Sequence, residues 1–120
     1  MKVQIVEDEL IIAKVYKMFL EKEGHEIVSS VADGRRALEE FKLHQPDLVM
    51  LDIQLNSSLT GLEVAKSIRK MSDAFIIFVT ASPLDHTVNM TSMIPNSEVL
   101  IKPVELSTLS DKLAELEKQD

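Results

Sequence analysis

The chain has 120 residues, and its 13 Lys and Arg against 20 Asp and Glu give a formal net charge of -7. This acidic balance argues against nucleic-acid binding by the domain itself and favours metal cations or basic partner surfaces. The 4% aromatic content excludes a base-stacking platform, and the lack of cysteine excludes disulfides, thiolate metal sites and cysteine catalysis. No apolar run approaches the length of a membrane span and no signal peptide is evident, so we expect a soluble, cytoplasmic protein.

Short apolar runs alternate with segments of helical spacing along the whole chain. The first predicted elements are a strand at 3–6, a helix from 12 to Gly24, a strand at 26–31, a helix that is marked by Ala37, Leu38 and Phe41 and stops before Pro46, and a strand at 47–52. The later ones are a helix carried by Leu62, Ala65 and Ile68, a strand at 74–80, a weakly patterned helix before Pro95, a strand at 99–101, and a helix with the stripe Leu106, Leu109, Leu113 and Leu116. Such alternation predicts an α/β fold with a parallel sheet covered by helices on both faces.

The third predicted strand reads DLVMLD, with four consecutive apolar residues between Asp47 and Asp52. A continuous apolar run of this kind is typical of a strand that is buried on both faces of a parallel sheet. The less apolar run at 26–31 is expected at an edge of the sheet. In an open parallel sheet the functional residues lie at the carboxyl ends of the strands, so Asp52 is placed where a site would form.

Polar side chains follow four of the predicted strands. Glu7 and Asp8 follow the first strand, Asp52 ends the third, Thr80 ends the fourth and Lys102 follows the fifth. Two carboxylates about 4 Å apart repel by roughly 4 kcal/mol at an effective dielectric constant of about 20, so three of them require protons or a cation. A hard cation with oxygen ligands, such as Mg²⁺, is the economical solution.

The same cluster has the groups needed for phosphoryl chemistry. With a metal ion holding phosphoryl oxygens, Lys102 can contact one oxygen and Thr80 can donate a hydrogen bond to another. Asp52 is then a plausible nucleophile toward phosphorus, and the product is an acyl phosphate. Each residue alone has a plainer interpretation, as a helix start, a turn residue or a solvated lysine; the ordered set at separate strand ends is what points to this chemistry.

The sequence strongly resembles the receiver domain of two-component response regulators, as in the chemotaxis response regulator, over essentially the whole chain. The segments that carry the resemblance are IVEDE, DLVMLDIQL, GLEVAKSIR, FVTAS and LIKP. The resemblance implies a flavodoxin-like, doubly wound, five-stranded parallel sheet in the order 2-1-3-4-5. It also implies one receiver domain over residues 1–120, with no output domain in this chain.

The resemblance further implies a role for each residue of the cluster. Asp52 matches the phosphoacceptor, Thr80 the switch hydroxyl, and Lys102 the lysine that contacts the phosphoryl group. The implied Mg²⁺ ligands are Glu7, Asp8, Asp52 and the backbone carbonyl of Gln54. Two departures from the usual pattern stand out: the segment after Asp52 is one residue longer than usual, and Val99 stands where a tyrosine or phenylalanine is frequent.

The implied function is a phosphorylation-activated switch in two-component signal transduction or a phosphorelay. A partner histidine kinase or phosphotransfer protein would supply the phosphoryl group to Asp52 in a Mg²⁺-dependent, self-catalysed reaction, followed by autodephosphorylation. The last two helices and the fifth strand would then change their exposed face for a downstream effector or a fused output domain, with a homodimer as one form. The domain itself is expected to contact neither nucleic acid nor membrane.

Two other functions stay open. A degenerate receiver would act only as a protein-interaction module, and the altered position at Val99 is the feature that favours it. A Mg²⁺-dependent aspartyl phosphohydrolase is the other alternative, although that type uses a second aspartate two residues after the first, where Gln54 stands. Among the remaining residues, we expect His25, His44 and His86 on the surface, and Met90 and Met93 in the core.

Overall fold

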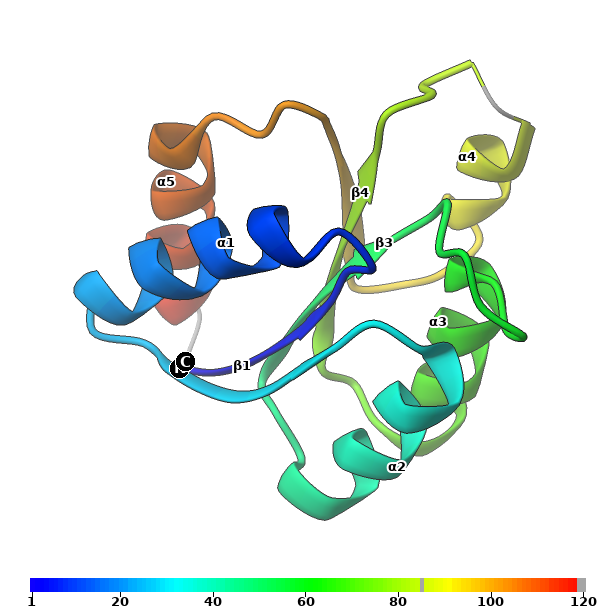
Figure 1. The fold of residues 1–120 in the computed structure, drawn as a ribbon, viewed down its shortest axis with the longest axis horizontal. Helices are drawn as coiled ribbons and strands as arrows, with labels where there is room; N and C mark the ends of the chain where they lie inside the picture. Colours follow the sequence, from blue (N-terminus) through cyan, green and yellow to red (C-terminus); the bar gives the residue numbers. More distant parts are fainter. Residues whose placement is uncertain (85, 119–120) are drawn as a thin grey trace.

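The structure is a computed structural model that describes residues 1–84 and 86–118. Strands β1 to β5 are Lys2–Val6, Glu26–Val31, Leu48–Asp52, Phe75–Thr80 and Ser97–Ile101, and helices α1 to α5 are Leu10–Lys22, Gly34–His44, Gly61–Met71, His86–Thr91 and Leu106–Glu117. Strand and helix alternate throughout (Figure 1). Within the described part of the chain, no helix is both long and apolar enough to cross a membrane.

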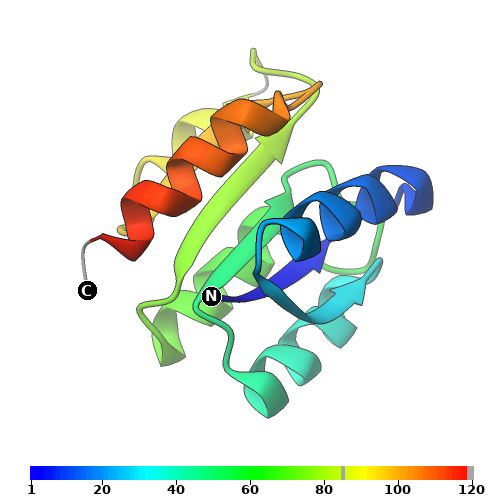
Figure 2. The same ribbon diagram turned by 90° about the vertical axis from the view of Figure 1, so that its left-hand side faces the viewer.

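All five strands are parallel and lie in the order β2-β1-β3-β4-β5. Helices α1 and α5 cover one face of this sheet, and α2, α3 and α4 cover the other (Figures 1 and 2). The order confirms the prediction, including the edge position of β2. Because the chain reverses its direction of winding after β2, β1 and β3 are neighbours, and their carboxyl ends define the crevice where ligands bind in folds of this type.

Strand β3 is buried on both faces, as its continuous apolar run predicts. Leu48 and Met50 pack against α1 and α5, whereas Val49 and Leu51 pack against α2 and α3. Successive side chains of a strand point to opposite faces, so a strand between two helical layers must be apolar at every position. Asp52 is the one charged residue of β3, and it stands at the carboxyl end.

The start of α3 is fixed against the end of β3. Thr60 and Glu63 form a capping box, in which each side chain accepts a hydrogen bond from the other residue's backbone N–H, at 3.1 and 2.9 Å. The next residue, Gly61, is so close to the strand that a Cβ atom there would lie 2.3 Å from the carbonyl oxygen of Asp52. Glycine is therefore required at this position, and the first residue of α3 packs against the backbone of Asp52, the predicted acceptor.

Two expectations about α4 and β5 differ in detail from the structure. Strand β5 begins at Ser97, two residues earlier than predicted. It is an edge strand, so polar side chains such as Ser97 and Glu98 can face solvent, and the apolar pattern marks only part of it. The prediction that Met90 and Met93 fill the core is wrong: they are 39% and 79% exposed, and Ile94 occupies the core position beside Met93.

The prediction of a surface position is also wrong for His25. Its side chain is only 7% exposed, and its Nδ1 atom lies 3.2 Å from the amino group of Met1. His44, by contrast, is partly exposed and lies 3.1 Å from the carboxylate of Glu40, one helical turn earlier. The burial of His25 results from the return of the chain after Gly24, a contact between distant residues that local spacing does not indicate.

Candidate functional site

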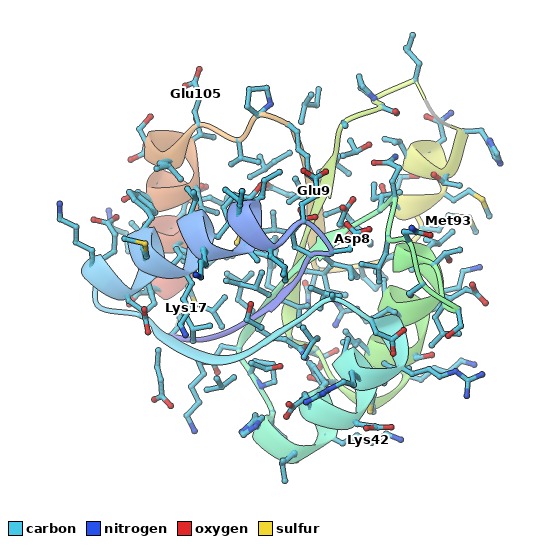
Figure 3. All side chains as sticks on the ribbon, viewed as in Figure 1. Asp8, Glu9, Lys17, Lys42, Met93 and Glu105 are labelled. Atoms are coloured by element: carbon cyan, nitrogen blue, oxygen red, sulfur yellow. The ribbon has the colours of Figure 1, made fainter. Side chains whose placement is uncertain are left out.

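Three carboxylates meet at the carboxyl edge of the sheet. Glu7 and Asp8 follow β1, and Asp52 ends β3; one oxygen from each lies within 4.8 Å of the others. Glu7 and Asp52 are buried, whereas Asp8 is partly exposed. Figure 3 shows Asp8 and Glu9 at the junction between β1 and α1. The adjacent positions of β1 and β3 thus bring together carboxylates that are 44 residues or more apart in the chain.

Lys102 is the cation of this cluster. Its Nζ atom lies 2.8 Å from Oε1 of Glu7 and 3.2 Å from Oδ2 of Asp52. The backbone N–H of Lys102 donates to the carbonyl oxygen of Thr80 at 2.7 Å, which ties the residue to the end of β4, and its peptide bond to Pro103 is cis. One lysine therefore bridges the two buried carboxylates across the top of the sheet.

The charges of this cluster are not balanced. Burial raises the pKa of Glu7 to about 7, against the opposing effect of the hydrogen bond from Lys102. Burial alone would lower the pKa of Lys102, but Glu7 and Asp52 together raise it above its ordinary value, so the ammonium stays charged. A single ammonium against three carboxylates leaves a site that favours a further proton or cation.

Hydrogen bonds from the loop after β3 hold the carboxylates in place. The backbone N–H of Gln54 donates to Oδ1 of Asp52 at 2.9 Å, and that of Asn56 donates to Oδ2 of Asp8 at 3.2 Å. Both carboxylates keep further lone pairs for other ligands. The loop therefore couples the end of β3 to the end of β1 and orients two of the three acids.

The loop after Asp52 is hydrogen-bonded to the start of α2. The hydroxyl of Ser57 accepts a hydrogen bond from the backbone N–H of Gly34 at 3.1 Å and donates to the carbonyl of Leu59 at 2.6 Å. Ser57 thereby satisfies an N–H group at the start of α2 that has no partner within the helix. These two hydrogen bonds fix the middle of the loop between the end of β3 and the start of α2.

Thr80 is completely buried and holds a hydrogen bond that sequence reasoning did not foresee. Its Oγ1 atom donates to Oε1 of Gln54 at 2.9 Å and accepts from the backbone N–H of Ser82 at 3.0 Å. The backbone N–H of Ala81 also points to Oε1 of Gln54, at 3.3 Å. Only the backbone carbonyl of Gln54 was expected to take part in the site, and no sequence pattern indicates the contact of its side chain.

The donor set fits a hard divalent cation. Every candidate ligand is an oxygen atom, the carboxylates are close enough to share one ion, and their negative charge exceeds what Lys102 neutralises. Mg²⁺ prefers such ligands and is commonly held by one or two carboxylates with waters and phosphate oxygens. The acidic cluster is therefore consistent with a magnesium site.

A doubly wound parallel sheet of order 2-1-3-4-5, with an acidic cluster and a lysine at its carboxyl edge, defines the receiver class of signalling domains. Residues 3–114 match the family described as "Response regulator receiver domain". The chain belongs to this family.

Among curated proteins, the chain is 33% identical over 108 residues to the transcriptional regulatory protein PdtaR of Mycobacterium tuberculosis, covering 90% of this chain and 52% of PdtaR. It therefore spans about half the length of that relative. It is also 35% identical over 115 residues to the autoinducer 2 sensor kinase/phosphatase LuxQ of Vibrio cholerae, covering 94% of this chain and 13% of LuxQ.

The solved structures give the same result. The signal receiver domain of a modulated diguanylate cyclase from Desulfovibrio desulfuricans G20 has a TM-score of 0.85 and 30% identity, covering 98% of this chain and 95% of that one. The chemotaxis protein CheY4 of Vibrio cholerae has a TM-score of 0.84 and 25% identity, covering 95% of this chain and 96% of that one. Receivers thus occur in relatives described as transcriptional regulators, sensor kinases and chemotaxis proteins.

Proposed function

We propose that this chain is a phosphorylation-activated switch that accepts a phosphoryl group on Asp52 from the phosphohistidine of a sensor kinase or phosphotransfer protein. The observation that supports it best is the position of Asp52. Its carboxylate is buried at the strand end, contacted by Lys102 at 3.2 Å and grouped with Glu7 and Asp8 within 4.8 Å. In the proposed scheme residues 1–120 act as one receiver unit.

The proposed transfer is a displacement at phosphorus. An oxygen of Asp52 forms a bond to the phosphorus atom while the bond to the donor's imidazole nitrogen breaks, and the electron pair of that bond stays on the nitrogen. Glu7, Asp8, Asp52 and the backbone carbonyl of Gln54 would hold Mg²⁺, which supplies charge neutralisation for the phosphoryl oxygens. Lys102 would exchange one carboxylate contact for a phosphoryl oxygen. Attack by water later returns Asp52 to a carboxylate and releases phosphate.

The new phosphoryl oxygens would attract the hydroxyl of Thr80, which stands at the end of β4, next to Lys102. Movement of Thr80 would alter the face made by α4, β5 and α5 and so reach an effector or an output domain. The packing there supports such a response, because a hollow of about 410 Å³ lies between α4 and β5 and is lined by Val88, Ile94 and Val99, among others. In this scheme the contacts of the phosphoryl group with Thr80 and Lys102 shift the equilibrium from the resting state of this face to its switched state.

The exposed face of α1 supports a protein as the phosphoryl donor. Leu10, Ile11, Val15 and Met18 lie on this helix with exposed fractions of 72, 80, 46 and 69%. Helix α1 begins at Leu10, two residues after Asp8, so the first turn of this apolar face is close in the chain to the acidic pair. Contiguous exposed apolar side chains mark interaction surfaces. We assign this face to the protein that brings the phosphohistidine to Asp52.

The experiment is the intact mass of the chain after incubation with acetyl phosphate, with and without Mg²⁺, for the wild type and Asp52→Asn. The proposal expects one added phosphoryl group, only with Mg²⁺ and only when Asp52 is present. An adduct on Asp52→Asn would contradict the assignment of the acceptor. Binding of Mg²⁺ without any adduct would favour the interaction module, and continuous release of phosphate at an enzyme-like rate would favour the phosphohydrolase.

A further inference from the structure

The side chain of Gln54 connects the acceptor loop to the end of β4. Its backbone N–H donates to Asp52, while its side-chain carbonyl accepts from the hydroxyl of Thr80 at 2.9 Å. The orientation of the amide is fixed by Ala81, whose backbone N–H lies 3.3 Å from the same atom and can only donate. The atom that faces Thr80 is therefore the oxygen Oε1, and the hydroxyl proton of Thr80 is directed to it.

A threonine hydroxyl has only one proton to donate. The backbone N–H of Ser82 already donates to Oγ1 of Thr80 at 3.0 Å, so Gln54 receives the proton that Thr80 has available. The proposed switch requires the same proton for an oxygen of the phosphoryl group on Asp52. The two bonds exclude each other.

We propose that Gln54 is a positioning residue that holds Thr80 in the resting state and competes with the phosphoryl group for its hydroxyl. This inference rests on the proposed function and adds a residue that sets how readily the switch responds. The competition involves only the side chain of Gln54, so it is separable from the metal, which would use the backbone carbonyl.

The contact between Gln54 and Thr80 is only weakly stabilised. The Nε2 atom of Gln54 is buried and has no hydrogen-bond partner within the described residues 1–84 and 86–118. The two hydrogen bonds that Oε1 accepts stabilise the amide in its position beside Thr80. The unpaired, buried N–H groups of Nε2 destabilise the same position. The balance of these effects leaves a weak restraint, and removing the restraint should tighten binding of a phosphoryl mimic about three- to tenfold, the size of one net hydrogen bond.

The test uses beryllofluoride with Mg²⁺ as the probe, since it mimics a phosphoryl group on an aspartate. The Gln54→Met variant keeps the length of the side chain and the backbone carbonyl but has no amide. We expect its dissociation constant for beryllofluoride to be about three- to tenfold lower than that of the wild type. The shift of the Thr80 methyl group, followed by NMR without beryllofluoride, should move toward its position in the bound wild type.

Variants at Thr80 supply the matched controls. In a Thr80→Val background the hydroxyl is absent, so Gln54→Met should leave the dissociation constant unchanged within about twofold. In a Thr80→Ser background the hydroxyl is retained, and the tightening should return. This double-mutant cycle isolates the coupling between the two side chains from any general effect of residue 54 on the site.

The outcomes separate this inference from the proposed function. If the wild type binds beryllofluoride and Gln54→Met binds it equally or more weakly, competition for Thr80 is wrong while the switch stands. If the tightening persists in the Thr80→Val background, the effect of Gln54 does not pass through the hydroxyl, which also overturns the inference. If neither the wild type nor any variant binds beryllofluoride with Mg²⁺, the proposed function fails and the competition fails with it.

Discussion

Lys102 and Glu7 form a buried ion pair at the carboxyl edge of the sheet, with 2.8 Å between Nζ and Oε1. The side chains are 13% and 2% exposed. The same ammonium lies 3.2 Å from Asp52, so in the resting state it serves two acids that repel each other. Lys102, which is proposed to contact the phosphoryl group, therefore also stabilises the two buried carboxylates in the resting state.

Replacing Lys102 by methionine should lower the free energy of unfolding by about 3 kcal/mol at pH 8, because two buried carboxylates lose their counter-ion. The loss should be smaller at pH 5, since the pKa of Glu7 is already raised to about 7 and protonation removes one of the two charges. Urea unfolding at both pH values measures the difference.

Lys17→Met is the matched control, because Lys17 lies on the exposed side of α1 (Figure 3). It should change the free energy of unfolding by no more than about 0.5 kcal/mol at either pH. Equal losses for Lys102→Met at pH 5 and pH 8 would show that the carboxylates are not what destabilises the variant.

Mg²⁺ should stabilise the wild type and bind at least about tenfold more weakly to Asp8→Asn, which loses a charged ligand but keeps an oxygen for the N–H of Asn56. Calorimetric titration gives the dissociation constant. Glu9→Gln is the control: Glu9 is the adjacent exposed acid and is not among the three clustered carboxylates. A similar loss in Glu9→Gln would mean that general charge attracts the ion.

Gly61→Ala should destabilise the chain by at least about 2 kcal/mol, because the new methyl group would lie 2.3 Å from the carbonyl oxygen of Asp52. Gly24→Ala should cost only about 1 kcal/mol, since that position has a φ of 94° but open space around it. Thermal unfolding of both variants provides the comparison. A smaller effect at Gly61 than at Gly24 would contradict the tight junction of β3 with α3.

Ile11→Ser should slow phosphoryl transfer from a phosphorylated donor protein by about fivefold or more, through loss of apolar contact at the proposed docking face. Because Ile11 is 80% exposed, its stability and its phosphorylation by acetyl phosphate should stay at the level of the wild type. Leu43→Ser is the control, as Leu43 is 74% exposed on α2, across the sheet. Equal slowing by both variants would place docking elsewhere.

His25 should make stability depend on pH. Burial lowers its pKa, with a further contribution from the positive amino group of Met1. The unfolded chain therefore binds a proton at His25 more readily than the folded chain does. The contribution to stability is present above the pKa in the unfolded chain, about 6.5, and is lost as the pH falls through the lower pKa in the folded chain. His25→Gln removes this titration. Urea unfolding between pH 5 and 8 should show that the free energy of unfolding of the wild type falls relative to that of His25→Gln as the pH is lowered. A difference between the two that is the same at every pH would contradict the role of His25.

The parallel α/β fold and the clustering of polar residues at the strand ends were accessible from the residue pattern, whereas the strand order 2-1-3-4-5 came from the resemblance to receiver domains. The reason is physical: the continuous apolar run in DLVMLD is typical of a strand between two helical layers, and parallel strands place their carboxyl ends at one edge of the sheet. The prediction of Asp52 beside Glu7 and Asp8 needed no knowledge of individual contacts, because the strand ends share one edge and the order implied by the resemblance makes the first and third strands neighbours.

Other features depend on contacts between distant side chains, which spacing does not encode. The resemblance implied a metal-binding role for the backbone carbonyl of Gln54, yet the contact of its side-chain amide with Thr80 depends on rotamers and on the path of the loop. His25 is buried by the amino-terminal residue, and Met93 is exposed because Ile94 takes the core position. Single polar or flexible residues in loops carry no periodicity from which burial can be read.

Helix α1 has one buried face and one exposed face that carries apolar side chains. Ala13, Tyr16 and Leu20 are buried against the sheet, whereas Ile11 and Met18 are 80% and 69% exposed. Substitutions on the outer face change what the surface attracts at almost no cost in folding, and they leave the acids and Lys102 untouched. Under the proposed function, copies that arise by gene duplication can therefore diverge in the donor that they bind while they keep the same acidic cluster.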